Sequence, residues 1–467
     1  MRTLTPIFCN KFAKSLAKRR EKWYNGMSYN TIPSLRGKDA FMNTKQLSAA
    51  ILDGTLDTKL IALYGEANLA AQKTRYLDAV SAFEALYGTR EAGIYSVSGR
   101  SELSGNHTDH NHGCVIAASI DLDIIAIASA TDDGVIRVKS EGFGEDVVEI
   151  AAYTAPVEEK FGSSASIIAG MCAGFTKNGH KVGGFCAYTT SSVLKGSGLS
   201  SSAAFEDMIG NILNHLYNDG TVDNVEIAML AQYAENQFFG KPCGLMDQVA
   251  CASGGIVAID FAETTAPKID KLTFDITAAG YNLCIVNTGG NHADLTDDYA
   301  SVPAEMKKVA SFFGKNFLRE LSLKEIIANA KALREFCGDR ALLRAIHFFN
   351  ENERVVSQKQ ALLDSDLPRF FEGVKSSGRS SFCYLQNVYT TKNVAEQGLS
   401  LALAVAEEFL ADKTAAWRVH GGGFAGTIQA FVPTADAEAF RTYMDGVFGE
   451  GACIVLRIRG EGAIRLL

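Results

Sequence analysis

The sequence predicts an α+β fold in which helices pack on a mixed β-sheet, and three observations carry this prediction. From about Thr44 to Leu86, apolar residues recur at helical spacing. Short β-branched segments bounded by Gly or Asp follow between residues 93 and 193, as expected of strands. After residue 425 the chain closes on a strand, a helix and a strand, which is typical of a small α+β layer.

The first elements are two or three helices within residues 44–86, where apolar positions repeat three or four residues apart. These positions include Leu47, Ile51, Leu60, Leu63, Val80, Phe83 and Leu86. The strands that follow are short and punctuated by Gly or Asp. They read GIYSVSG (93–99), CVIAASI (114–120), IIAIASA (124–130), GVIRVKS (134–140) and FCAYTTSSV (185–193).

A well-marked helix begins at the serines 200–202, which are good N-cap residues. Its apolar face consists of Phe205, Ile209, Ile212, Leu213 and Leu216, and Asn218-Asp219-Gly220 end it. A second helix is expected from about Val222 to Phe238. The remaining segments are the strands GGIVAIDF and NLCIVNTGG, a mainly helical stretch from Tyr299 to about Leu410, and the closing GTIQAFVP, ADAEAFRTYMDGVFG and CIVLRIRG.

Composition narrows the class of protein. A chain of 467 residues with 47% hydrophobic residues accommodates two domains with a sizeable core. The net charge of −8 argues against binding to nucleic acid or acidic membranes, and no apolar run reaches the roughly 18 residues of a membrane helix. Ten scattered cysteines without a C-x-x-C pair indicate buried thiols in a reducing compartment. We therefore expect a cytoplasmic protein, either a monomer or a weak homo-oligomer.

The chain has a basic start that differs from the rest. Nine Lys or Arg precede Met42, against two acidic residues. We interpret residues 1–41 as a basic N-terminal extension outside the core, while an organelle-targeting peptide and a true start at Met42 stay open. The remainder divides near residue 280 into an N-terminal domain, 42–280, and a C-terminal domain, 281–467.

The stretch GRSELSGNHTDHNHG (99–113) places three histidines and an aspartate within residues 107–112. A metal site, a sugar-binding loop and a polar turn are the alternatives. In an extended segment only residues two apart share a face, and a helix would bring His107 and His110 together but turn His112 away. The spacing therefore fits usual metal-ligand sets poorly, although a distant carboxylate would complete one.

The segment LKGSGLSSSAA (194–204) joins a strand to a helix, and a helix N-terminus offers unpaired N–H groups to an anion. Gly196 and Gly198 allow close approach and the serines add donors, so the segment fits a phosphate loop, although an ordinary capped helix fits equally well. It lacks the P-loop pattern. A second glycine cluster, VHGGGFAGT (419–427), permits close backbone approach or simply tight packing.

Two carboxylates lie between these glycine segments. Glu235, on the second helix, together with a serine hydroxyl would suit Mg²⁺, which prefers oxygen ligands; a solvated helix face is the alternative. Asp247, in KPCGLMDQVACASGG, would take or orient the proton of an acceptor hydroxyl, or would merely cap a turn. Such a set suits phosphoryl transfer, which depends mainly on positioning and charge stabilisation.

Three of these motifs resemble one family. GRSELSGNHTDHNHG is similar to the galactokinase signature, and LKGSGLSSSAAFE and WRVHGGGFAGTIQAFVP resemble the second and third motifs of the wider GHMP group of small-molecule kinases. CGLMDQ resembles the catalytic-aspartate segment, and RAIHFFNENERV (344–355) a further galactokinase helix. The resemblance implies the two-domain GHMP α+β fold, with a mixed sheet and helices first, a ferredoxin-like α+β domain second, and the active site between them.

The resemblance also implies residue roles. Asp247 and Arg100 would be catalytic, with Arg100 lowering the pKa of Asp247. The remaining roles fall into three groups. Sugar contacts would come from Asn106, His107, Asp109, Gly244 and Tyr299; the nucleotide would be held by Lys195, Gly196, Ser197, Gly198, Leu199, Ser200, Ser201, Ser202, Gly421, Gly422 and Gly423; and Mg²⁺ would be held by Ser202 and Glu235.

The implied reaction is the transfer of phosphate from ATP to the anomeric hydroxyl of galactose, which gives galactose 1-phosphate and ADP. The sequence departs from the signature in one exchange: Asn106 stands where the family has glutamate, and Glu102 where it has asparagine. Position 106 is expected to read the hydroxyl on carbon six, so the sugar could differ, or Glu102 could restore the charge. A kinase for N-acetylgalactosamine or arabinose, and a non-catalytic sugar sensor, therefore stay open.

Overall fold

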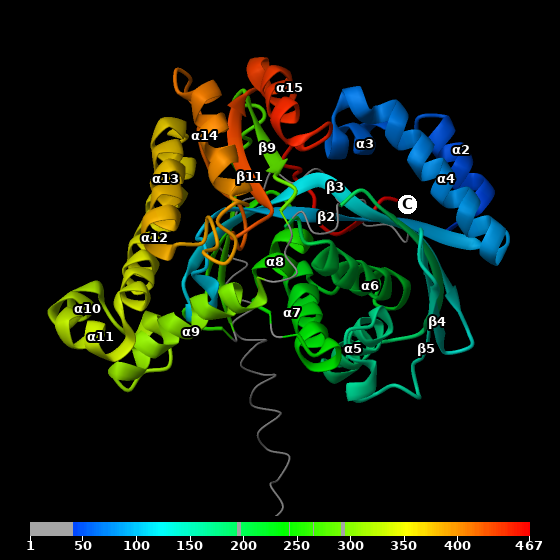
Figure 1. Ribbon diagram of the computed structural model, residues 1–467. Helices are drawn as coiled ribbons and strands as arrows, with labels where there is room; N and C mark the ends of the chain where they lie inside the picture. Colours follow the sequence, from blue (N-terminus) through cyan, green and yellow to red (C-terminus); the bar gives the residue numbers. More distant parts are fainter. Residues whose placement is uncertain (1–40, 194–197, 242, 265, 291–294) are drawn as a thin grey trace, which may run out of the picture. The chain divides into compact units, whose positions relative to one another are not determined.

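Two β-sheets organise the described part of the chain, which in this computed structural model comprises residues 41–193, 198–241, 243–264, 266–290 and 295–467 (Figure 1). Phe41–Leu467 form one compact unit. The basic extension, apart from Phe41, lies outside the described residues. The larger sheet has nine strands in the order β1-β2-β3-β6-β4-β5, with β13 beside β2, β7 beside β3 and β8 beside β7. These strands are β1 (Met42–Asn43), β2 (Glu91–Ser104), β3 (Cys114–Thr131), β4 (Val135–Ser140), β5 (Glu145–Glu149), β6 (Gly184–Ser191), β7 (Ile256–Asp260), β8 (Lys268–Leu272) and β13 (Ile464–Arg465).

Helices cover both faces of this sheet. One face carries α2 (Thr44–Leu52), α3 (Asp57–Tyr64) and α4 (Leu69–Tyr87), and the other carries α5 (Ser164–Lys177), α6 (Ser201–Tyr217), α7 (Asn224–Ala234) and α8 (Met246–Ser253) (Figure 1). Side chains on a strand alternate between faces. Ile125 and Ile127 accordingly pack in the core with α2–α4, whereas Ala126 and Ala128 pack with α5–α8. The helices expected within residues 44–86 are confirmed as three.

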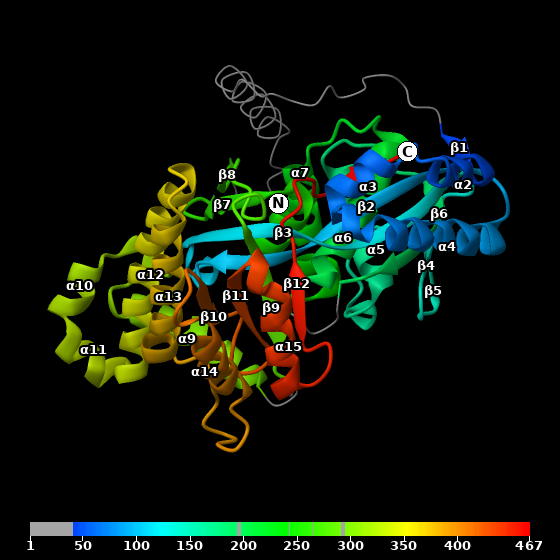
Figure 2. The same cartoon turned by 90° about the horizontal axis from the view of Figure 1, so that it is seen from above.

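The smaller sheet has the order β10-β11-β9-β12 and is antiparallel throughout. Its strands are β9 (Tyr281–Asn287), β10 (Ala416–Val419), β11 (Thr427–Pro433) and β12 (Cys453–Leu456). Helices α14 (Gly398–Leu410) and α15 (Ala437–Phe448) pack on one face of it (Figure 2). The sequence β9-α14-β10-β11-α15-β12 with this strand order is the ferredoxin-like arrangement that we expected.

A helical segment connects β9 to α14. It consists of α9 (Thr296–Phe312), α10 (Leu323–Ala328), α11 (Ala330–Cys337), α12 (Asp339–Leu363) and α13 (Leu367–Ser380). The smaller sheet is built only from strands after residue 280, which agrees with the place of the predicted boundary. However, β13 returns to the larger sheet, and the division into two domains stays a prediction.

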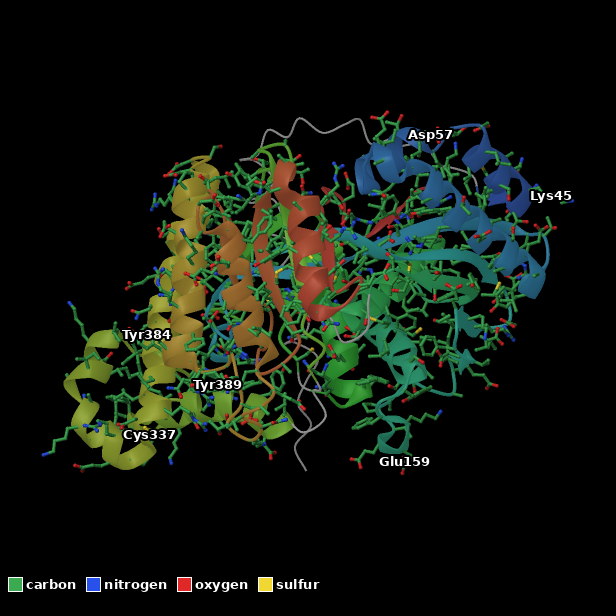
Figure 3. The ribbon with its side chains drawn as sticks, turned by 45° about the horizontal axis from the view of Figure 1, so that its top comes forward. Lys45, Asp57, Glu159, Cys337, Tyr384 and Tyr389 are labelled. Atoms are coloured by element: carbon green, nitrogen blue, oxygen red, sulfur yellow. The ribbon has the colours of Figure 1, made fainter. Side chains whose placement is uncertain are left out.

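Lys45 on α2 and Glu159 both project outward from these layers (Figure 3). In the described residues, no helix combines the length and the apolar character needed to cross a membrane. The nine cysteines that the structure describes are all free thiols.

One expectation is wrong: CVIAASI and IIAIASA form a single strand, β3, although Asp123 lies between them. The Asp123 side chain is fully buried, and it pairs with Arg75 at 2.7 Å and with Arg459 at 3.1 Å. Ser96 also donates to it at 2.5 Å. A buried charge is tolerated when it is paired and hydrogen-bonded, so the aspartate joins helix α4 and the C-terminal segment to the sheet instead of ending the strand.

We predict that Asp123→Asn lowers the free energy of unfolding by about 3–5 kcal/mol, because it leaves two buried guanidinium groups without their counter-charge. Urea unfolding followed by circular dichroism measures the change. Asp133→Asn is the matched control, since Asp133 forms an exposed pair with Arg137, and it should leave the midpoint unchanged. Equal midpoints for both variants would contradict the structural role of Asp123.

Candidate active site

The site is built around Asp247, in the first turn of α8. Its carboxylate accepts two hydrogen bonds from Arg100 of β2, from Nε to Oδ1 at 2.8 Å and from Nη2 to Oδ2 at 2.7 Å. Such a bidentate pair fixes the plane of the carboxylate as well as its position. The two predicted catalytic residues are therefore brought together, although they are 147 residues apart in the sequence.

Arg100 also holds the end of the predicted phosphate loop. Its backbone N–H donates to the carbonyl of Leu199 at 3.1 Å, and its Nη1 donates to the carbonyl of Gly198. Ser200 adds a hydrogen bond from Oγ to Oδ2 of Asp247. Ser200 occupies the N-cap position of α6 in the left-handed region (φ 58°) without a side-chain cap. The expected side-chain cap from Ser200 is therefore absent, because this hydroxyl donates to Asp247 instead of capping the helix.

These donors decide the ionisation of Asp247. Burial alone would raise its pKa, but the charge of Arg100 and the hydrogen bonds from Arg100 and Ser200 outweigh burial and hold the pKa below its usual value. The side chain is nevertheless 34% exposed, and it faces a cavity. Asp247 is therefore an anion that remains accessible to a ligand.

This cavity, which we call the sugar cavity, has a volume of about 460 Å³. Four of the five predicted sugar-contact residues line it, namely His107, Asp109, Gly244 and Tyr299. The predicted catalytic pair, Arg100 and Asp247, also lines it, as do Gly421 and Gly422, which were expected at the nucleotide. Two glycines are needed for this shape. A Cβ on Gly244 would lie 2.6 Å from Oδ2 of Asp109, and one on Gly422 would lie 2.2 Å from the ring of Tyr299.

Asn106 does not line the sugar cavity. Its side chain is fully buried behind the wall. The amide donates to the carbonyl of Gly421 at 2.6 Å and to Glu102 at 3.4 Å, and it accepts from Asn387 at 2.8 Å and Ser381 at 3.2 Å. Each polar atom of the Asn106 side chain thus has a hydrogen-bond partner in the protein, and the residue supports the cavity wall from behind. Its contact with the sugar stays a prediction.

The surroundings of His107 favour one neutral form of its imidazole ring. Its Nε2 lies 2.8 Å from the carbonyl of Gly422, so that nitrogen carries the proton and Nδ1 is left as an acceptor. Burial lowers the pKa of His107 to about 4. Of the other two histidines, His110 lies at the cavity beside Asp109, whereas His112 stacks on Phe317 with ring centres 3.7 Å apart. In the described residues no group of three or more His, Cys, Asp or Glu could hold a metal ion.

A second cavity of about 750 Å³, the nucleotide cavity, lies between β4–β6 and α5–α6. Ser201 and Ser202 line it. Lys195, Gly196 and Ser197 lie outside the described residues. This cavity is not lined by Gly198, Leu199 or Ser200, which form the end of the loop. The sugar cavity, and not the nucleotide cavity, is lined by Gly421 and Gly422. Gly423 lies against the carbonyl of Asn387, where a Cβ would come within 2.0 Å.

The two cavities share Ser202, Glu235 and Lys241. Glu235 is 3% exposed, in a π-helical turn (Glu235–Phe239) that continues α7, so it is not on a solvated helix face. Its carboxylate accepts from Lys241 at 3.2 Å and from Gln248 at 2.9 Å. π-turns occur frequently at functional sites, and this one turns Glu235 toward the junction of the cavities.

Glu206 is a further residue of this junction that the motifs did not indicate. The side-chain amide of Gln248, which donates to Glu235, also donates to the carboxylate of Glu206 at 3.0 Å. Glu206 lines the nucleotide cavity. Burial raises the pKa of Glu206, and the charge of Glu235 adds to the rise. The spacing could have revealed it, because Glu206 follows Ser202 by four residues and so lies on the same helix face. Two facing carboxylates with one lysine are short of positive charge, which suits a divalent cation.

Comparisons with known proteins agree with this geometry. Residues 81–130 match the family model "Galactokinase galactose-binding signature", and residues 167–255 match "GHMP kinases N terminal domain". A galactokinase of Streptomyces coelicolor is 31% identical over 370 residues, which cover 78% of this chain and 91% of that protein. The chain belongs to the galactokinase family. A galactokinase of Actinobacillus pleuropneumoniae serotype 5b is also 31% identical, with the same coverage of both chains.

Solved structures show the same fold. The Lactococcus lactis galactokinase complexed with galactose matches with a TM-score of 0.69 and 25% identity, over 82% of this chain and 98% of that one. The mevalonate kinase of Methanococcus jannaschii matches with a TM-score of 0.55 and 15% identity, over 79% and 98%. The fold is that of the GHMP kinases, and the segment matched by the galactose-binding signature contains Glu102, His107 and Asp109 of the sugar cavity.

We predict that the affinity for galactose, measured by titration calorimetry, stays constant between about pH 5.5 and 8. His107 remains neutral there because its pKa is about 4. In the unfolded chain the pKa of a histidine is about 6.5. Between pH 4 and pH 6.5 His107 is therefore protonated in the unfolded state but neutral in the folded state, and the free energy of unfolding decreases as the pH falls through this range. A midpoint near pH 6.5 that His107→Gln removes would contradict this assignment.

Proposed function

We propose that the chain binds galactose in the sugar cavity and ATP in the nucleotide cavity, and forms galactose 1-phosphate and ADP. The observation that carries this proposal is the junction of the two cavities at Ser202, Glu235 and Lys241, with Asp247 open to the sugar side. A γ-phosphoryl group at this junction would lie between the nucleotide and the acceptor hydroxyl. Phosphoryl transfer requires such positioning and compensation of charge, with little other chemistry.

Asp247 is suited to orient the anomeric hydroxyl. Among the described residues, its Oδ2 already accepts from Arg100 and Ser200, whereas Oδ1 accepts only from Arg100. Oδ1 therefore retains a lone pair for the hydroxyl proton. Because its pKa is lowered, the aspartate is a weak base. The proton would leave late, after the sugar oxygen has begun to bond to phosphorus and the bond from phosphorus to ADP has weakened.

The nucleotide is expected to lie with its phosphates at the N-terminus of α6, where free N–H groups and the helix dipole favour anions. Lys195 to Ser202 would wrap the triphosphate. Ser202 and Glu235 would hold Mg²⁺, with Glu206 beside them. When bound, this ion would neutralise charge on the phosphate oxygens. The support for this placement is the pair of carboxylates of Glu206 and Glu235, which both accept a hydrogen bond from the side-chain amide of Gln248.

Two alternatives from the sequence need to be tested. A kinase for N-acetylgalactosamine or arabinose would use the same catalytic residues with a different fit in the sugar cavity. A sugar sensor would bind without turnover; the presence of Asp247, Arg100 and Ser202 in one site favours an enzyme. An assay that couples ADP release to a dye, run with all three sugars, separates these possibilities. We expect galactose to give the highest kcat/KM, and binding without ADP release would identify a sensor.

Two further expectations belong to this proposal. We propose that the protein acts in the cytoplasm, which the free thiols of the nine described cysteines support. We also propose that it is a monomer or a weak homo-oligomer.

We predict that Asp247→Asn lowers kcat for galactose by about 10²–10⁴-fold, because the amide neither accepts the proton nor pairs with the charge of Arg100. Galactose binding should remain measurable by calorimetry. Ser200→Ala is the graded control: it removes one of three hydrogen bonds to the carboxylate and should reduce kcat far less. An unchanged kcat in Asp247→Asn would exclude this residue from catalysis.

We predict that Glu235→Gln raises the Mg²⁺ concentration needed for half-maximal activity by at least about 10-fold, as expected when a carboxylate ligand becomes an amide. Direct Mn²⁺ binding by electron paramagnetic resonance, with ADP present, gives a second readout that does not depend on turnover. Glu226→Gln, a change of an exposed α7 residue beside His180, is the control. Identical metal titrations for Glu235→Gln and wild type would refute the ligand role.

A further inference from the structure

Glu102 is a buried carboxylate that opens into the sugar cavity. It lies near the end of β2, and its side chain is 6% exposed yet forms part of the cavity wall. It occupies the position next but one to Arg100. Between Arg100 and Glu102 the pairing of β2 with β3 is regular, and register shifts occur only before and after this stretch. Residues two apart on a strand point to the same face, so both side chains face the cavity.

The carboxylate is held firmly from behind. Arg418 of β10, which is fully buried, donates to Oε1 of Glu102, and the amide of Asn106 approaches the same oxygen at 3.4 Å. Arg418 is fixed in turn by a hydrogen bond to Ser377 at 2.9 Å. Glu102 thus has little freedom to move, which is the condition for a residue that selects a ligand by shape and hydrogen bonding.

The other oxygen of Glu102 is unused. No hydrogen bond among the described residues involves Oε2, and this atom is not among the buried polar atoms that are sealed from solvent. Oε2 therefore opens into the cavity. A fixed carboxylate oxygen in a cavity of sugar size is an acceptor for a hydroxyl group, and a site built to hydrogen-bond a hydroxyl rejects analogues that lack it.

The strand also sets which end of the sugar Glu102 meets. Arg100 holds Asp247, where the anomeric hydroxyl lies in the proposed function. Two residues along a strand span ~6.7 Å, which is about the separation of hydroxyl oxygens on opposite sides of a pyranose. We propose that Oε2 of Glu102 accepts a hydrogen bond from the sugar hydroxyl on carbon four or carbon six, and so determines sugar specificity from position 102. This inference rests on the proposed placement of the anomeric hydroxyl at Asp247.

The test measures dissociation constants by titration calorimetry for galactose and its 2-deoxy, 4-deoxy and 6-deoxy derivatives, with wild type and Glu102→Gln. Wild type should bind the 4-deoxy or the 6-deoxy sugar at least about 10-fold more weakly than galactose. Glu102→Gln should reduce that ratio about 5-fold, because a neutral amide replaces a charge-assisted bond. The ratio for 2-deoxygalactose should not change, since that hydroxyl adjoins the anomeric carbon.

Controls separate this role from a structural one. Glu351→Gln removes another buried carboxylate near Arg418, at 3.9 Å, that does not line the cavity, and it should weaken all four sugars alike. If Glu102→Gln fails to fold, Glu102→Met with Arg418→Met removes both charges of the pair and serves instead, since well-packed apolar residues often replace a buried ion pair without loss of stability. Equal weakening of all four sugars by the Glu102 variant would overturn the proposal.

Parallel ADP-release assays distinguish a failure of the proposed kinase function from a failure of the proposed role of Glu102. Sugar binding with the expected deoxy-sugar pattern but without ADP release would refute the proposed kinase function and still support Glu102 as the selecting residue. Galactose turnover with unchanged deoxy-sugar ratios in Glu102→Gln would support the kinase function and refute the role of Glu102.

Discussion

The guanidinium group of Arg100 connects the three segments that make the site. From β2 it binds both carboxylate oxygens of Asp247 on α8, and its remaining nitrogen binds the carbonyl of Gly198 at the end of the phosphate loop. One planar, permanently charged group therefore fixes the acceptor side and the phosphate side relative to each other. Since transfer depends on alignment within about an ångström, this interaction sets the geometry on which every other residue of the site depends.

The same interaction fixes the electrostatics. Arg100 keeps Asp247 ionised, so the catalytic carboxylate is a positioning group before it is a base. Glu206 and Glu235 lie elsewhere, on either side of the amide of Gln248 and with Lys241 beside Glu235, and burial together with the charge of Glu235 raises the pKa of Glu206. The site thus contains two kinds of carboxylate. Asp247, which is paired with Arg100, faces the sugar hydroxyl, whereas Glu206 and Glu235 lie where a cation and the phosphates would meet.

The sequence predicted most of the fold and the chemistry, but not the wall of the sugar cavity. Local signals sufficed for α6 and for the strand–helix–strand ending, and the resemblance to the galactokinase motifs brought Asp247, Arg100, Ser202 and Glu235 together. Prediction from the sequence failed where partners come from distant segments. The two halves of β3, on either side of Asp123, are predicted as separate strands because Arg75 and Arg459 are not visible as partners of Asp123 in a linear sequence. The burial of Asn106 behind the cavity wall is equally invisible, because the contacts that bury it, from Gly421 and Asn387, come from about 300 residues away.

The exchange of glutamate and asparagine between positions 102 and 106 has a physical consequence that follows from those contacts. Asn106 faces the carbonyl of Gly421, which accepts its amide proton. A carboxylate there would set two acceptors against each other and leave that carbonyl without its donor. Glu102 faces Arg418, where a carboxylate is matched and an amide would remove the nearest counter-charge of a buried cation. Each residue therefore suits its own position and not the other's. The carboxylate that the family signature has at position 106 is found at position 102 in this chain, where Arg418 is its partner, and Asn106 instead donates to Gly421.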